Sequence, residues 1–474
     1  MPNDTATYNF EQRIPLIAVM LGGAFLAILN QTLLVTATPH VMAEFNLSEN
    51  AGQWITTIFM LVNGIMIPIT ALLMETFTTR RLFMTSMFIF SFGTIVCLLS
   101  TNFTVLMVGR VIQASGAGII MPLMMTVMML IFPKDKRGFA MGMAGLVIGF
   151  APGIGPTLSG WIIDVFPWRS LFLIVLPLAI LDIILAYFFM RNVISRTFPK
   201  VDIPSVIFSV FGFGGLLYSF SSVGDYGWSY PPALLAFGIG IVTLTVFIIR
   251  QLKLREPILE FRVLTYGIYA LTMVISMIAF MMLIAAETIL PIYMQVMAGF
   301  SAFESGLVIL PGALLMGVMS PVVGTIFDKI GARGLLITGF SIVVVTTFFF
   351  TRLTEETTLL YLIVVFAIRM FGISMLMMPS TTAGLNELPD SLMPHGTALT
   401  NTMRQIAASI GTAILVTVMS LTANETTSGH AQGAIDGVNT AFYTATGISF
   451  IGLILSLFIR KNPRDSEKDK TDLS

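Results

Sequence analysis

Long apolar stretches make up most of the chain, and short polar or charged segments separate them. A helix needs about 20 mostly apolar residues to cross a hydrocarbon layer about 30 Å thick. Fourteen stretches meet this requirement, so the pattern predicts fourteen transmembrane helices. They lie near residues 14–38, 52–74, 82–100, 104–132, 139–163, 170–190, 203–222, 231–249, 268–292, 304–327, 334–351, 358–380, 397–421 and 439–459.

Three of these stretches are less regular than the others, which leaves twelve or thirteen spans as alternatives. The stretch 203–222 contains Pro204 and several Gly and Ser residues, and the last two stretches have indistinct ends. At the start of the chain, residues 1–13 are polar. The apolar stretch that follows is too long for the apolar core of a signal peptide, so we expect a retained first helix.

The basic residues give an independent test of this count, because cytoplasmic loops of membrane proteins are rich in Lys and Arg. With both termini in the cytoplasm, only Arg169 and Arg352 of the 25 basic residues fall on the outer side, and Arg110 and Arg369 lie inside predicted helices. An odd number of spans would remove this asymmetry. We therefore expect fourteen spans with both termini in the cytoplasm.

Composition excludes several classes of protein. Only 11% of the residues are charged and 56% are hydrophobic, whereas soluble domains carry about 25% charged residues. The 25 basic and 25 acidic residues give no net charge, so we expect no nucleic-acid partner. The single cysteine, Cys97, cannot form an internal disulfide or a thiolate metal site, and we expect it to be a small buried hydrophobe.

No pattern in the chain predicts a catalytic site, a metal or a cofactor. The three histidines, His40, His395 and His430, lie far apart at the ends of predicted spans, and we expect each to be a surface residue. The phosphate-binding pattern Gly-x-x-x-x-Gly-Lys-Ser/Thr is absent from the sequence. We therefore expect a protein that is not an enzyme and that draws its energy from a gradient.

Two halves of six spans each repeat one another. Corresponding inner loops, Thr70–Arg81 and Gly324–Arg333, follow the second span of each half, and corresponding arginines, Arg110 and Arg369, lie inside the fourth. Each arginine is followed by a glycine and a proline in the same helix. The predicted units are an N-terminal six-helix bundle (1–198), an inserted transmembrane hairpin (199–256), a C-terminal six-helix bundle (257–460) and a cytoplasmic tail (461–474).

Four motifs carry a resemblance to a known family. The loop signature G-x-x-x-D-[RK]-x-G-x-[RK] is intact at Gly324–Arg333, and a degraded copy in the first half has Glu75 in place of the Asp. The fourth span contains Gly109–Gly118, and the fifth contains the glycine- and proline-rich segment Gly149–Gly160. Over Arg13 to about Arg460 the chain resembles the fourteen-span drug:proton antiporters of the major facilitator superfamily (EmrB/QacA type), and among them the LmrB-like lincomycin-resistance exporters.

This resemblance implies an all-α integral membrane fold of two six-helix bundles plus an inserted two-helix hairpin. It also implies a proton-coupled multidrug efflux transporter in the plasma membrane of a bacterium, functional as a monomer, with drugs, protons and the lipid bilayer as its partners. Gating roles are implied for eight loop residues: Glu75, Arg80, Arg81, Gly324, Asp328, Lys329, Gly331 and Arg333. Sealing of the fifth span against the other half is implied for the antiporter motif Gly149, Pro152, Gly153, Gly155, Pro156 and Gly160, with simple tight packing as the alternative.

An arginine inside a span is costly in hydrocarbon, so Arg110 must face the interior of the bundle. It is either a structural arginine bonded to helix carbonyls or, as the resemblance implies, the residue that couples protonation to conformational change. In the family this arginine faces an acid in the first span, where the present chain has Asn30. Asn30 can hydrogen-bond Arg110 but cannot titrate.

Few acids lie inside spans, and these are the candidates for carrying protons. Glu287 is the first candidate, because its span corresponds to the first span, which lines the cavity in this fold, and because partial desolvation favours reversible protonation. Alternatively, Glu287 reaches outer water. Asp182 lies on a peripheral helix, where we expect it to pair with polar neighbours, including those of the inserted hairpin.

Substrate recognition is expected to use an apolar cavity, since 32 Met and 38 Phe residues suit varied lipophilic ligands. Arg404 is either an interfacial anchor or a functional group. The scarcity of buried acids favours neutral or weakly basic compounds. Two rival functions stay open: export of an endogenous metabolite or lipid, and a non-transporting sensor or assembly partner. The polar residues expected at the cavity are Gln31, Asn63, Gln113, Tyr293, Gln295, Arg369 and Asn401.

Overall fold

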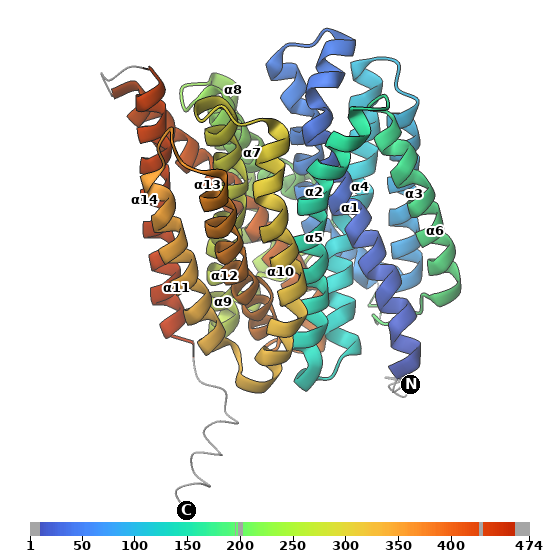
Figure 1. The fold of residues 1–474 in the computed structure, drawn as a ribbon. Coiled ribbons are helices and arrows are strands. Elements are labelled where there is room, and N and C mark those ends of the chain that lie inside the picture. The colour runs from blue at the N-terminus through green and yellow to red at the C-terminus, as the bar shows by residue number, and fades with distance from the viewer. Residues whose placement is uncertain (1–9, 195, 198–201, 426–429, 460–474) are drawn as a thin grey trace, which may run out of the picture.

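The computed structural model describes residues 10–194, 196–197, 202–425 and 430–459, and over these residues it contains long helices and no β-strand (Figure 1). Fourteen of the helices are long and apolar enough to cross a membrane, which confirms the predicted all-α membrane fold. The long helices are α1 (Phe10–Phe45), α2 (Glu49–Thr76), α3 (Thr79–Leu98), α4 (Phe103–Ile131), α5 (Arg137–Ile163), α6 (Ser170–Phe189), α7 (Ile203–Tyr226), α8 (Pro231–Lys253), α9 (Gly267–Ile292), α10 (Ala302–Ile330), α11 (Ala332–Phe349), α12 (Leu359–Leu385), α13 (Met393–Glu425) and α14 (His430–Leu457). Short helical turns are η1 (Lys134–Lys136), η2 (Phe261–Thr265), η3 (Tyr293–Met297), η4 (Phe350–Arg352) and η5 (Asp390–Leu392).

Polar side chains fix the starts of several helices. The first turn of a helix has N–H groups without intrahelical partners, and a preceding Ser, Thr or Asn side chain can accept from one of them. Ser48, Asn102 and Thr358 do this for α2, α4 and α12. Ser301 and Glu304 cap α10 reciprocally, because each side chain accepts from the other residue's N–H.

The long helices pack as two groups, α1–α6 and α9–α14, which lie side by side (Figure 1). Between the groups, α5 packs along α10, and α13 packs against α2 and α4. The first and last helices, α1 and α14, have their terminal ends on the same side of the bundle (Figure 1). We refer to this side as the predicted inner end and to the opposite side as the predicted outer end.

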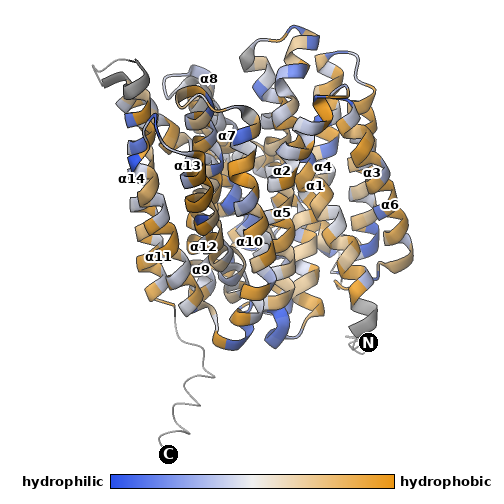
Figure 2. Cartoon of the chain, viewed as in Figure 1, coloured by the Kyte–Doolittle hydropathy of each residue, from blue (hydrophilic) through white to orange (hydrophobic). Residues whose placement is uncertain are grey.

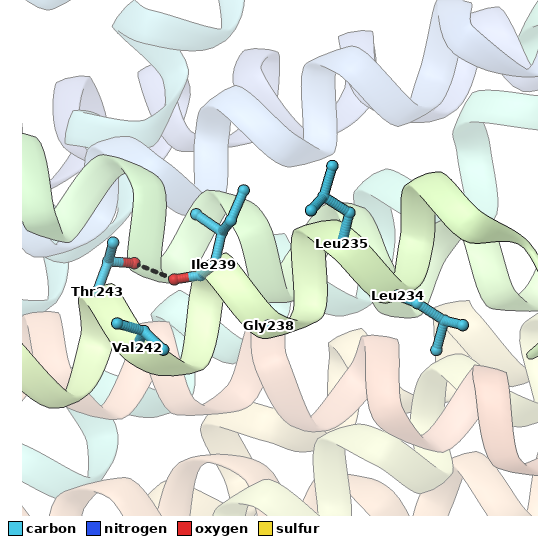
Figure 3. Close-up of a pocket in the computed structure, with 6 residues that line it drawn as sticks. All are labelled: Leu234, Leu235, Gly238, Ile239, Val242 and Thr243. Carbon is cyan, nitrogen blue, oxygen red and sulfur yellow. Dashed lines mark hydrogen bonds between the residues drawn. The ribbon is translucent and has the colours of Figure 1, made fainter.

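The hairpin α7–α8 lies against both groups through one of its helices. α7 packs against α2 and against α13, whereas α8 packs on α7 and leaves most of its surface exposed. Figure 3 shows a shallow apolar hollow on α8, where the hydroxyl of Thr243 donates to the carbonyl of Ile239 in the same helix at 2.7 Å. With no free polar group at this hollow, the exposed face of α8 is suited to lipid.

Apolar residues fill the interior and also cover most of the outer surface, and polar residues gather mainly at the helix ends (Figure 2). Cys97 is fully buried, as predicted, and its thiol contacts the carbonyl of Leu106. Against this apolar background, the charged and amide side chains of the interior stand out, and they define the candidate site.

Candidate transport site

Arg110 of α4 lies at the centre of a buried polar network in the first half. Its side chain is completely buried; Nε donates to the carbonyl of Ile55 on α2 at 3.1 Å, and Nη1 donates to Gln113 at 2.9 Å. Gln113 in turn donates to Thr94 of α3 at 2.8 Å. The guanidinium also stacks on the ring of Phe59, 4.3 Å from its centroid. Arg110 is therefore held inside the half directly by α2 and, through Gln113, by α3.

The expected hydrogen bond between Arg110 and Asn30 is not present. Asn30 of α1 is buried, yet its Nδ2 has no hydrogen-bond partner in the part of the chain that the structure describes, and the same is true of Nη2 of Arg110. The arginine instead uses an α2 carbonyl and Gln113. Gln113, which was expected to line a cavity, is fully buried and hydrogen-bonds within this network.

The corresponding arginine of the second half has an acid beside it. Arg369 of α12 donates from Nε to Thr347 of α11 at 3.3 Å and from Nη2 to the carbonyl of Met282 on α9 at 2.5 Å. Its Nη1 has no hydrogen-bond partner among the described residues. Glu287, further along α9 and half-buried, interacts electrostatically with this guanidinium. Glu287 and Arg369 thus interact electrostatically within the membrane-spanning part of the second half, without a direct salt bridge between the described side chains.

The remaining residues expected at a cavity divide into three groups. Tyr293 is fully buried and donates to the carbonyl of Thr354 at 2.6 Å, so it packs inside the second half. Gln295 is exposed and lies in η3, which follows α9. Half-buried positions, which leave a polar side chain accessible, are occupied by Gln31, Asn63 and Asn401.

Asp182 of α6 does not pair with the hairpin. It is 5% exposed and packs against Gly22 and Gly23 of α1, within its own half. A Cβ on Gly22 or Gly23 would lie 3.0 or 3.1 Å from a carboxyl oxygen, so a side chain there would crowd the carboxyl group. Oδ2 of Asp182 has no hydrogen-bond partner among the described residues.

The antiporter motif of α5 faces two different helices. Gly149 and Gly153 lie against α10, where a Cβ on Gly149 would be 2.8 Å from the backbone N of Gly317 and a Cβ on Gly153 would collide with Ala313. Gly155 instead lies against Thr32 of α1, in its own half. Pro152 and Pro156 lie within the same helix, and Gly160 has open space around it.

The seam between α5 and α10 is also tight at the predicted inner end. Gly138 and Gly324 meet backbone to backbone, with no room for a side chain on either. Asp328 of α10 accepts hydrogen bonds from the backbone N–H groups of Gly138, at 2.7 Å, and Phe139, at 2.9 Å. These N–H groups belong to the first turn of α5, so the carboxylate of one half caps a helix of the other.

The second acid of the inner end, Glu75 of α2, makes the corresponding contact in the other direction. Its Oε1 lies 3.1 Å from Nε2 of His395, the third residue of α13. In the repeat, α2 corresponds to α10 and α13 to α5, so each acid reaches the start of the symmetry-related helix. His395 is only 5% exposed, and the expectation of a surface residue was therefore wrong.

Further contacts between the halves lie near the same end. Arg137 pairs with Asp390 at 3.2 Å, Thr126 and Thr397 lie 2.5 Å apart, and Asn401 reaches Met125 at 3.1 Å. The described contacts therefore close the predicted inner end.

The other loop residues differ in their surroundings. Arg80 donates to the carbonyl of Tyr187 on α6 at 2.5 Å, within the first half. Gly331 ends α10 with a positive φ of 77°. Arg81 and Lys329 are exposed, and Arg333 is half-buried.

Arg404 is buried between helices and is not an interfacial anchor. It is 3% exposed, and it donates to Ser276 of α9 at 2.5 Å, to the carbonyl of Met377 on α12 at 2.9 Å and to Thr381. This arginine ties three helices of the second half together. The sequence alone does not predict these contacts, because an arginine near the end of a span can either reach the membrane surface or be buried between helices.

Comparisons with known proteins agree with this architecture. The family model described as Major Facilitator Superfamily matches residues 20–412. The uncharacterized MFS-type transporter YcnB of Bacillus subtilis is 53% identical over 457 residues, covering 96% of this chain and 97% of that protein. The lincomycin resistance protein LmrB of Listeria monocytogenes is 42% identical over 456 residues, covering 94% and 97%.

The crystal structure of the human organic anion transporter MFSD10 superposes with a TM-score of 0.69 at 13% identity, covering 94% of this chain and all of that one, and it supports the fold alone. With its bacterial relatives and fourteen membrane-spanning helices, the chain is a multi-pass protein of the bacterial plasma membrane. It is a transporter, not an enzyme, and belongs to the major facilitator superfamily.

Proposed function

We propose that the protein is a proton-coupled efflux transporter that exports lipophilic, neutral or weakly basic compounds by alternating access. Its predicted inner end faces the cytoplasm in this proposal, as the distribution of basic residues favours. The names of the lincomycin-resistance relatives support a drug as substrate. Lincomycin, which carries one weakly basic amine, is accordingly the first compound to test.

The observation that supports the proposal is the electrostatic interaction between Glu287 and Arg369. An ionised carboxylate in a membrane-spanning segment is costly unless it is paired or protonated. Glu287 has Arg369 as its electrostatic partner, and Nη1 of that arginine has no hydrogen bond among the described residues. A proton on Glu287 would cancel its attraction to the guanidinium. Protonation would therefore change how tightly α9 is held to α12.

One proton per cycle supplies enough energy for useful export. Moving one elementary charge across 100 mV yields about 2.3 kcal/mol. Since about 1.4 kcal/mol corresponds to a tenfold ratio, this sustains a concentration ratio of about 40-fold for a neutral compound. A pH gradient across the membrane adds to this value.

The test is drug-dependent proton movement in sealed inside-out vesicles that contain the protein, with an acid lumen imposed beforehand. Lincomycin added outside should collapse the gradient with the wild type and not with Glu287→Gln. A matched control is Glu355→Gln, which removes an exposed carboxylate from the loop before α12 and should behave as the wild type.

Each other outcome changes the proposal. If Glu287→Gln collapses the gradient as the wild type does while vesicles without the protein keep it, antiport stands and Glu287 is not the proton carrier. If the wild type responds neither to lincomycin nor to a panel of lipophilic compounds, the drug-export proposal fails, and an endogenous metabolite or lipid becomes the substrate to seek.

A further inference from the structure

The segment that connects the inserted hairpin to the second half is buried and firmly held. It runs from Leu254 to Tyr266 between α8 and α9, and Ile258 and Leu259 within it are 1% and 0% exposed. Their backbone N–H groups donate to Oε1 of Gln251, on the last turn of α8, at 2.7 and 3.3 Å. A single fully buried side chain of the hairpin therefore holds the connecting segment in place.

Gln251 also ties the two helices of the hairpin together. Its Nε2 donates to the hydroxyl of Ser205 on α7 at 2.7 Å, and Ser205 donates to Asp202, which precedes α7. Asp202 in turn accepts two hydrogen bonds from Arg250 of α8, at 2.6 and 2.8 Å. At the predicted inner end, the hairpin is thus one hydrogen-bonded unit.

The connecting segment continues from this unit to the contact between the two halves. The backbone N–H of Glu260 donates to Nδ1 of His395 at 3.3 Å, and Nε2 of His395 faces Glu75 at 3.1 Å. Because Nδ1 accepts a hydrogen bond, the ring proton lies on Nε2, which donates to the Glu75 carboxylate. One imidazole therefore joins the first half, the second half and the segment that leads to the hairpin.

An apolar contact follows the same route. The rings of Phe213 on α7 and Phe247 on α8 meet edge to face with centroids 6.0 Å apart, and Phe247 meets Phe261 of the connecting segment at 5.9 Å. Phe213 and Phe247 are fully buried, and Phe261 is 8% exposed. A shift of the hairpin would therefore displace the connecting segment, because they share both a hydrogen-bonded and an apolar contact.

We propose that the inserted hairpin holds the inner end closed through a relay from Gln251 through the backbone of the connecting segment to His395 and Glu75. His395 is the positioning residue of this relay. The inference depends on the alternating-access part of the proposed function, and it is independent of the proton carrier and of the drug. The inference gives α7 and α8, the two helices inserted between the six-helix halves, a role in controlling the conformation of the transporter.

Opening of the inner end can be measured with a single thiol at the contact between the halves. Thr397 is fully buried and touches Thr126 of the other half, so Thr397→Cys in a Cys97→Ala background should react slowly with N-ethylmaleimide while the end is closed. Asp328→Asn serves as the positive control. It weakens the cap on α5 at the same end without touching the relay.

The test variants each cut the relay at one point. Gln251→Leu removes the bonds to the connecting segment, and it should accelerate labelling by about tenfold, the change that loss of one to two net hydrogen bonds produces. His395→Gln keeps a donor near the position of Nε2, toward Glu75, and has no acceptor at the position of Nδ1, toward the N–H of Glu260. It should label as fast as Gln251→Leu, and the double variant no faster, because both cut one path. Thr243→Ala on the lipid-facing side of α8 is the matched control and should label at the wild-type rate.

Four results would overturn or narrow the inference. If Asp328→Asn labels fast while Gln251→Leu labels like Thr243→Ala, the hairpin does not hold the inner end. If the effects of Gln251→Leu and His395→Gln multiply, the two residues act separately and the relay is refuted. If even Asp328→Asn fails to accelerate labelling, the inner end does not open, and alternating access fails with it. Should Gln251→Leu not fold, Gln251→Asn shortens the side chain by one methylene and withdraws its oxygen from the N–H groups of Ile258 and Leu259, and unchanged labelling in that variant would refute the relay.

Discussion

Adding one methyl group to α5 should have opposite effects at two of its glycines. A Cβ on Gly149 would lie 2.8 Å from the backbone N and 3.0 Å from the Cα of Gly317 on α10, well inside the 3.4 Å at which ordinary contact begins. Both of these atoms are backbone, so no side chain can rotate away. A Cβ on Gly160, near the predicted outer end of the same helix, meets nothing within 4 Å.

The expected free energies follow from these distances. Replacing Gly by Ala within a helix stabilises it by about 0.8–1 kcal/mol through helix propensity. At Gly160 this gain stands alone. At Gly149 the two helices must move apart by about 0.6 Å, and overpacking of this kind costs about 1–3 kcal/mol. We therefore expect Gly149→Ala to be less stable than Gly160→Ala by roughly 1–3 kcal/mol, which corresponds to a few degrees in melting temperature.

The chain supplies its own reporter for the measurement. Cys97 is the single cysteine and is fully buried, so a thiol-reactive fluorescent dye reports unfolding of the detergent-solubilised protein as this residue becomes exposed. Wild type and both variants are heated side by side. A melting temperature for Gly149→Ala equal to or above that of Gly160→Ala would refute the close approach of α5 and α10.

Three further predictions concern polar contacts. Arg250 beside Asp202 lowers the pKa of that carboxyl to about 2. Because this pKa lies below the unfolded value of about 3.9, the ion pair stabilises the folded protein above pH 4, and this stabilisation is lost as pH falls from about 4 to 2. Protection of the α7 amides against hydrogen exchange should therefore fall in that window, with no such step in Asp202→Asn. Arg404→Met leaves buried acceptors without a donor, among them Thr381, and should cost about 1–3 kcal/mol, seen as a lower melting temperature by the Cys97 assay. Arg369→Lys keeps the charge but loses the guanidinium fork, and drug-dependent proton flux in vesicles should fall by about tenfold or more.

Much of the fold follows from length and polarity alone. A membrane requires apolar helices of a narrow range of lengths, and this requirement is strong enough that even the irregular stretch near 203–222 forms the span Ile203–Val223. The repeat of loops and arginines also indicated which helices correspond. Helix ends extend beyond the apolar stretches, as in α1, because polar residues such as those near Phe45 continue a helix outside the hydrocarbon.

The side-chain partners could not be predicted in the same way, and the reason is physical. In a soluble helix, the apolar stripe shows which face is buried. A membrane helix is apolar on its lipid face and on its packed face alike, so the sequence gives the depth of a residue but not the direction in which it points. The resemblance therefore implied a contact of Arg110 with α1, whereas this arginine bonds a carbonyl of α2, and Tyr293 and His395 bond residues that are distant in the sequence.

The two halves make corresponding contacts at the predicted inner end, but their buried arginines have different partners within the membrane. At the inner end, an acid of each half reaches the start of the corresponding helix of the other, as Asp328 and Glu75 do. In the interior, the arginine of the first half bonds only neutral partners, while Arg369 interacts electrostatically with Glu287. In the proposed transport cycle, a proton bound near Arg369 changes the charge of the second half alone, so the energy of proton movement would enter on one side of the seam. The first half then follows through the contacts of α5 with α10 and of α2 with α13. Variants at those contacts should therefore uncouple transport from proton binding even though they leave Glu287 untouched.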